Sequence, residues 1–79
     1  MGLPSTAGFS AYPNPASDRL FVRLPDAGNL VLRSLAGQLI YQTPVLPLAW
    51  VDLPPLAAGQ YLLELQTSEQ TWHQRWVIR

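Results

Sequence analysis

The sequence predicts one all-β domain, a sandwich of about seven short antiparallel strands. Three observations favour this class. Eight prolines interrupt the 79 residues and leave few stretches long enough for a helix. The uninterrupted stretches alternate in polarity or are rich in β-branched and aromatic residues, as half-buried strands are. Turn residues separate these stretches about every 8–12 residues, which is typical of a β-sandwich or a small barrel.

The composition is that of a small domain with a packed core. Hydrophobic residues make up 48% of the chain and charged residues 13%, about half the usual share of roughly 25%. Disordered chains combine low hydrophobicity with high charge, so this balance argues against disorder. Five Arg balance five Asp and Glu, and Lys is absent, which argues against a nucleic-acid partner.

The first two predicted strands cover residues 9–12 and 19–24. Between them, Pro13-Asn14-Pro15 fixes two φ values and forms a stiff corner, and neither proline can donate to a ladder. Residues 1–8 are mostly small and show no periodicity, so we predict a flexible lead ahead of the domain.

A hairpin is predicted next, from residues 29–35 and 38–42. Ala36-Gly37 forms its tight turn, because glycine adopts a positive φ at little cost. Proline and glycine at residues 25–28, and two prolines at residues 44–47, mark the breaks before and after the hairpin.

The last three predicted strands cover residues 48–53, 60–67 and 70–79. A helix over residues 53–65 is the competing interpretation, and Pro54-Pro55 with a following glycine argues against it. From the alternation along the strands we expect ten side chains in the core: Leu20, Val22, Leu30, Leu32, Leu39, Tyr61, Leu63, Leu65, Trp76 and Ile78.

The chain offers little for catalysis or metal binding. It has no cysteine and one histidine, which excludes thiol nucleophiles, thiolate sites and multi-histidine metal sites. His73 lies on the strand face opposite Trp72 and Trp76, so we predict that it faces solvent. Three aspartates in separate turns or strand ends are expected to cap turns rather than to bind a cation: Asp18, Asp26 and Asp52. No catalytic, cofactor-binding or metal-binding residue is predicted.

The three tryptophans leave two interpretations open. Trp50, Trp72 and Trp76 fill the core of a small domain, or they form an exposed platform on which sugars stack. Trp72 and Trp76 share strand parity with Ile78, which favours the core. Composition and spacing alone do not decide the function.

Four motifs occur together and in order over residues 9–79. They are Tyr12-Pro13-Asn14-Pro15-Ala16-Ser17-Asp18-Arg19-Leu20, the hairpin of residues 32–40 with central Gly37, Val51-Asp52-Leu53-Pro54-Pro55-Leu56-Ala57-Ala58-Gly59-Gln60-Tyr61-Leu62-Leu63, and Arg75-Trp76-Val77-Ile78-Arg79. In these motifs the chain resembles the type A C-terminal sorting domain of the bacterial type IX (Por) secretion system. That family opens on Y-P-N-P-A, continues with a hairpin and L-x-x-G-x-Y-x-L, and ends on a basic residue followed by an apolar strand.

The resemblance implies an immunoglobulin-like sandwich over residues 9–79 that serves as a secretion address and is not an enzyme. It implies a cargo fused on the N-terminal side and an outer-membrane translocon and shuttle that recognise the domain. It also implies a sortase-like cysteine protease that removes the domain. The cargo passes through the periplasm and is then released or attached to the cell surface. No cofactor, metal or nucleic acid is expected.

The resemblance also assigns roles to single positions. Eight motif residues are expected to be structural: Tyr12, Pro13, Asn14, Pro15, Asp18, Gly37, Gly59 and Tyr61. Recognition by the translocon is expected on the last strand, whose open edge and outward side chains would meet a receptor, at Arg75, Val77 and Arg79. Arg75 is either a charge that the receptor reads or only a gatekeeper that keeps the edge soluble.

Two positions depart from the family pattern. Ser34 stands where the family usually has Asp, and a serine makes a similar but weaker bond to the main chain. Arg75 stands where the family usually has Lys, which keeps the charge but changes the hydrogen-bond geometry.

Two other functions stay open at this point. One is a carbohydrate-binding module that uses the three tryptophans, and the other is an immunoglobulin-like spacer beside a catalytic domain. A sorting domain lies at the C-terminal end of its protein, whereas a module or a spacer lies anywhere along it.

Overall fold

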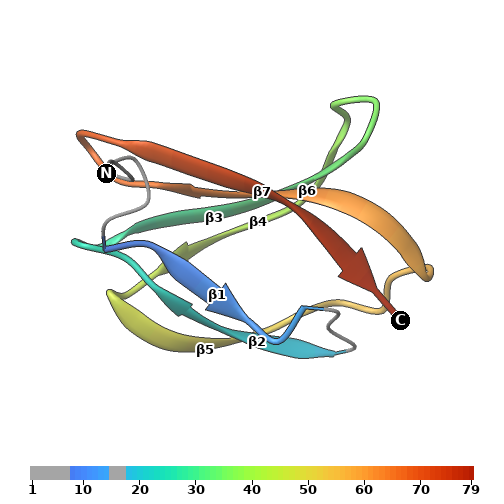
Figure 1. The fold of residues 1–79 in the computed structure, drawn as a ribbon, viewed down its shortest axis with the longest axis horizontal. Helices are drawn as coiled ribbons and strands as arrows, with labels where there is room; N and C mark the ends of the chain where they lie inside the picture. Colours follow the sequence, from blue (N-terminus) through green and yellow to red (C-terminus); the bar gives the residue numbers. More distant parts are fainter. Residues whose placement is uncertain (1–7, 15–17) are drawn as a thin grey trace, which may run out of the picture.

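Two antiparallel sheets pack face to face and enclose one core (Figure 1). The computed structural model describes residues 8–14 and 18–79. In these ranges it contains no helix and seven strands: β1 (Ser10–Tyr12), β2 (Arg19–Arg23), β3 (Gly28–Ser34), β4 (Leu39–Val45), β5 (Leu48–Asp52), β6 (Gly59–Gln66) and β7 (Thr71–Ile78). Accordingly, no membrane-spanning helix is found in this part of the chain.

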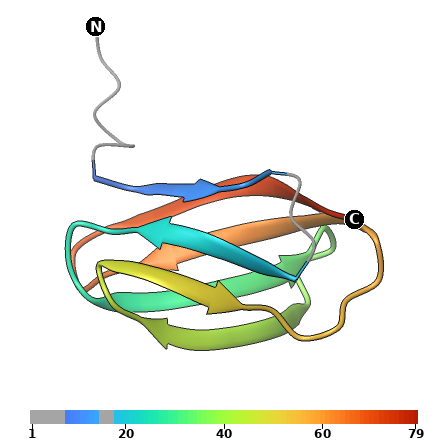
Figure 2. The same ribbon diagram turned by 90° about the horizontal axis from the view of Figure 1, so that it is seen from below.

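One sheet has the strand order β1-β2-β5 and the other β4-β3-β6-β7. The chain crosses from one layer to the other after β2, β4 and β5, and Figure 2 shows the three-stranded layer in front of the four-stranded one. This is the all-β, immunoglobulin-like sandwich that the sequence predicts. Residues 53–65 form no helix, as predicted, and β6 begins at Gly59.

The core lies between the sheets and comes from alternate residues of nearly every strand. Eight of the ten predicted core residues are fully or almost fully buried: Leu20, Val22, Leu30, Leu32, Leu63, Leu65, Trp76 and Ile78. Further side chains join the same cluster, among them Phe9, Leu24, Val45, Val51, Leu53 and Trp72. Tyr61 is only partly buried and packs against this cluster.

The prediction that Leu39 is buried is wrong, because 51% of Leu39 is exposed. The pairing of β3 with β4 shifts register between Leu32 and Arg33, so that Leu32 lies opposite Tyr41 while Arg33 lies opposite Leu39. Such a shift moves a side chain to the other face of the sheet. Tyr41 therefore packs against the core, and Leu39 faces solvent.

Strand β4 is longer than predicted, because it continues through Pro44 to Val45. Pro44 has no N–H to donate, and a strand tolerates it only where that N–H would point away from a neighbour. β4 is an edge strand with β3 as its one neighbour in the sheet, so no strand on its outer side needs a hydrogen bond from Pro44. The predicted break at residues 44–47 shrinks to the residues between Val45 and Leu48.

Gly28 begins β3 at a close approach of two chain segments. A Cβ built there would overlap the main-chain carbonyl oxygen of Gln66, which lies at the end of β6. Any larger residue would therefore push β3 and β6 apart at the end where the two central strands pair.

Candidate functional site

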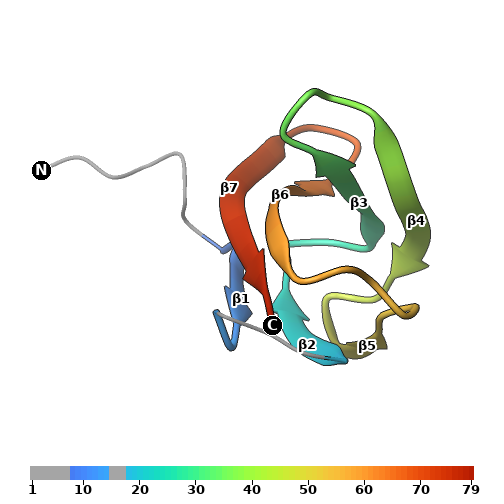
Figure 3. The same ribbon diagram turned by 90° about the vertical axis from the view of Figure 1, so that its right-hand side faces the viewer.

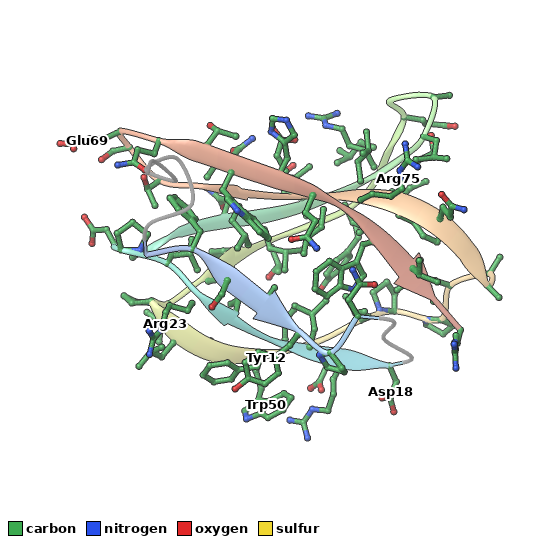
Figure 4. The ribbon with its side chains drawn as sticks, in the orientation of Figure 1. Tyr12, Asp18, Arg23, Trp50, Glu69 and Arg75 are labelled. Carbon is green, nitrogen blue, oxygen red and sulfur yellow. The ribbon has the colours of Figure 1, made fainter. Side chains whose placement is uncertain are left out.

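The terminal strand β7 presents alternate side chains to the core and to solvent, except that Gln74, on the core side, is exposed. Trp76 and Ile78 are buried and anchor the end of the strand between the sheets. The side chains of Arg75 and Arg79 are exposed, and Val77 is half-buried. Two positive charges and one apolar side chain therefore lie on the outer face at every second residue. Figure 4 shows Arg75 on the side of the molecule opposite Tyr12 and Trp50.

Asn14 clamps the outer edge of this strand. Its Nδ2 donates to the carbonyl oxygen of Arg75 at 3.3 Å, and its Oδ1 accepts from the main-chain N–H of Val77 at 3.1 Å. One carboxamide thus supplies both a donor and an acceptor to a strand 61 and 63 residues further along the chain. The opening motif and the terminal motif of the domain meet at this contact.

Strand β1 runs beside β7 although it pairs with β2 in the other sheet (Figure 3). Phe9, just before β1, stacks on Trp72 with ring centroids 6.3 Å apart and planes 4° apart. The two ends of β1 are therefore fastened to β7, by a ring stack at one end and by Asn14 at the other. The expectation of an open terminal edge is wrong at Arg75 and Val77, because Asn14 already occupies those main-chain groups.

The hairpin between β3 and β4 closes through the residue that departs from the family pattern. The Oγ of Ser34 accepts from the N–H of Gln38 at 3.1 Å, as predicted for a serine at this position. The N–H of Gly37 donates to the carbonyl oxygen of Ser34 at 2.8 Å, and Gly37 has a φ of 94°. A residue with a side chain would be strained at this φ, which explains the glycine.

The remaining motif residues hold loops to strands. The hydroxyl of Tyr61 donates to the carbonyl oxygen of Ala57 at 2.6 Å and so fastens the loop that precedes Gly59. The N–H of Leu53 donates to the carbonyl oxygen of Asp18 at 2.8 Å, which ties the start of β2 to the end of β5. Pro13 is exposed and follows a cis peptide bond, and the predicted role of Pro15 lies outside the described residues.

The three-stranded sheet carries a row of aromatic rings on its outer face. Tyr12, Phe21 and Trp50 lie side by side on β1, β2 and β5, with successive ring centroids 5.4 and 5.3 Å apart. The guanidinium of Arg19 lies 4.8 Å from the centre of the Trp50 ring. Trp50 is 53% exposed, so the interpretation that all three tryptophans fill the core does not hold for Trp50.

A shared sugar platform of the three tryptophans does not exist, because Trp72 and Trp76 are buried. The aromatic row does not replace it, since its ring planes meet at 34° and 65° and present no common flat surface. Such tilted and edge-on contacts are those of rings that stabilise paired strands.

The charged residues form separate local contacts. Asp26 caps its turn as predicted, because its Oδ1 accepts from the N–H of Ala27 at 2.8 Å. Asp52 does not cap a turn; it ends β5 opposite Arg19, with which it forms an exposed ion pair at 3.5 Å. His73 faces solvent as predicted. Among residues 8–14 and 18–79, no three His, Asp or Glu side chains gather in a way that would hold a metal ion.

The fold and this site define a class: a small immunoglobulin-like sandwich whose last strand is clamped by the corner that opens the domain. A family model described as the secretion system C-terminal sorting domain matches residues 10–79. The chain therefore belongs to this family, the C-terminal sorting domains of the type IX secretion system. A search of curated protein sequences gave no significant match.

Membership makes the domain a sorting signal for type IX secretion, a family of secretion signals rather than of catalytic domains. It implies interaction with the type IX secretion machinery. It also implies export across the outer membrane to the cell surface or the extracellular space.

Proposed function

We propose that the domain directs a cargo fused on its N-terminal side through the type IX translocon, and that the terminal strand carries the address. The outer-membrane translocon and its shuttle read this strand, and the cargo is then released or attached to the cell surface. The observation that carries the proposal is the geometry of β7, in which Trp76 and Ile78 are anchored in the core while Arg75 and Arg79 project into solvent.

The arrangement suits recognition for a physical reason. The buried Trp76 and Ile78 fix the main chain of the strand, so a receptor that binds it loses no entropy in ordering the backbone. The positive charge and N–H donors of each arginine suit a carboxylate or carbonyl oxygens on the receptor. Val77 lies between the two arginines and adds an apolar contact.

The test is export of a periplasmic reporter that carries the whole 79-residue chain at its C-terminus, in a bacterium with this secretion system. We expect the reporter in the culture medium or on the cell surface, and in the periplasm of a strain that lacks the translocon. A reporter without the domain is the control. Retention of the stable, folded fusion in the periplasm of the intact strain would contradict the proposed function.

We further propose that a sortase-like cysteine protease removes the domain, and that it cuts at or before Gly8. Phe9 is buried against Trp72, and β1 starts at Ser10, so a protease would have to open the packed domain to cut further along. Mass spectrometry of the exported cargo is expected to find its new C-terminus at or upstream of Gly8. A C-terminus beyond Asn14 would refute this position.

A further inference from the structure

The side chain of Asn14 occupies part of the outer edge of β7. β7 has β6 as its one hydrogen-bonded neighbour strand among the described residues, so its other edge faces away from the sheet. On that side the carbonyl of Arg75 and the N–H of Val77 are bonded to the side chain of Asn14 and not to a main chain. Main-chain groups of every second residue share one side of a strand, so those of Thr71 and His73 point to the same side.

The bonds of Asn14 follow the pattern of a parallel strand. In a parallel ladder, a residue that lies opposite residue j donates its N–H to the carbonyl oxygen of residue j−1. Its own carbonyl oxygen accepts from the N–H of residue j+1. Asn14 donates to Arg75 and accepts from Val77, which flank Trp76. Its carboxamide therefore takes the place of the N–H and C=O groups of one residue in a parallel strand beside Trp76. β1, which runs in the same direction as β7 in Figure 3, delivers it there.

We propose that the outer edge of β7 is a strand-acceptor site, and that its partner is an extended acidic segment which replaces the Asn14 carboxamide. The proposal rests on the proposed sorting role, because the site lies on the strand that the machinery is expected to read. An added strand extends the four-stranded sheet and bonds the main chain of residues 71–77, as in other cases of strand addition. Asn14 occupies this edge at Arg75 and Val77 until the partner arrives.

The charges of the strand select the kind of partner. A strand added beside β7 places every second side chain next to the outward row of His73, Arg75, Val77 and Arg79. Arg75 and Arg79 are exposed, and no acidic side chain pairs with them among the described residues. Opposite charges on neighbouring strands stabilise the pair, and like charges destabilise it. The segment that fits is therefore extended, with acidic residues at alternate positions.

The test uses the whole chain and a synthetic nine-residue peptide that alternates Glu and Val. A peptide that alternates Lys and Val is the control probe. Binding is followed through the amide NMR signals of His73, Arg75 and Val77. We expect Asn14→Ala to bind the Glu-Val peptide about tenfold more tightly than the wild-type chain, because two competing hydrogen bonds are gone.

Thr67→Ala is the matched control for loss of side-chain hydrogen bonds. Thr67 Oγ1 accepts from the N–H groups of Glu69 and Gln70 in the turn before β7 and does not touch its outer edge. We expect this variant to bind the peptide as the wild-type chain does. Arg75→Glu leaves the core intact and provides a second test; it is expected to prefer the Lys-Val peptide.

Three outcomes would overturn the proposal. Asn14→Ala binds the Glu-Val peptide no more tightly than the wild-type chain, or the shifted signals map to the edge of β4 or β5. Alternatively, Asn14→Ala dimerises through β7, which assigns the edge to a second copy of the chain. If the peptide binds as expected while the reporter fusion stays in the periplasm, that pair of results would support the acceptor site and contradict the sorting role.

Discussion

Leu63→Ala is expected to remove about half or more of the free energy of unfolding of the domain, and at the upper end of the expected cost to unfold it under native conditions. Leu63 is fully buried at the centre of the four-stranded sheet, in β6, with Leu32 of β3 opposite on one side and Gln74 of β7 on the other. Large-to-small changes at such positions cost about 2–5 kcal/mol, because transfer free energy is lost and a cavity remains. The whole free energy of unfolding of so small a domain is about 5 kcal/mol.

Urea denaturation followed by circular dichroism measures this loss. Leu39→Ala is the matched control, since it makes the same chemical change at a side chain that is 51% exposed. It is expected to change the free energy of unfolding by about 0.5 kcal/mol or less. Equal losses in the two variants would mean that the assignment of the core to these faces is wrong.

The strands were predictable because their signals are local. Alternating polarity gives the two faces of a strand directly, since side chains of a pleated strand repeat every second residue. Prolines and glycines mark the breaks, and all seven predicted segments overlap the seven observed strands. Leu63 and Trp76 could be assigned to the core in this way.

The exceptions arise where two strands meet. Leu39 alternates correctly within its own segment, but the register shift in its pairing with β3 turns it outward. Trp50 faces solvent because it lies opposite Phe21, on the outer side of the three-stranded sheet. The alternation of polarity within one strand does not reveal which strand it pairs with or in which register. The exposure of Leu39 and of Trp50 could therefore not be predicted from their own segments.

The contact of Asn14 with β7 could not be predicted from the sequence for the same reason. Asn14 between two prolines predicts a stiff corner, and Asn14 itself lies at a bend of the chain. Nothing local indicates that its side chain bonds main-chain groups of Arg75 and Val77. Many residue types could form a turn between two prolines. The presence of a residue with both a donor and an acceptor in its side chain is the local signal that indicates a longer-range contact.

Arg75→Glu together with Arg79→Glu is expected to reduce export of the reporter fusion about tenfold, because reversed charges repel a partner built for arginine. Both side chains are exposed, so the domain is expected to fold as before. Reporter in the culture medium and in the periplasm is quantified by immunoblotting, with the thermal stability of each purified fusion measured alongside.

Truncation after Arg75 is a weaker experiment, although it removes most of the proposed address. It deletes Trp76 and Ile78, which are buried, and Val77, whose N–H is bonded to Asn14. The shortened chain is expected to unfold, so a loss of export would not separate recognition from stability. Charge reversal changes the surface of β7 and leaves its buried side chains in place.

Two controls decide what the charges do. Arg23→Glu makes one such charge reversal at an exposed position of β2, in the other sheet, and is expected to leave export at the wild-type level. Arg75→Lys keeps the charge and is expected to export well, whereas a site that needs the guanidinium fork would lose export. If the Arg75→Glu and Arg79→Glu variant is exported like wild type, the arginines are only gatekeepers, because a glutamate at either position keeps the edge equally soluble.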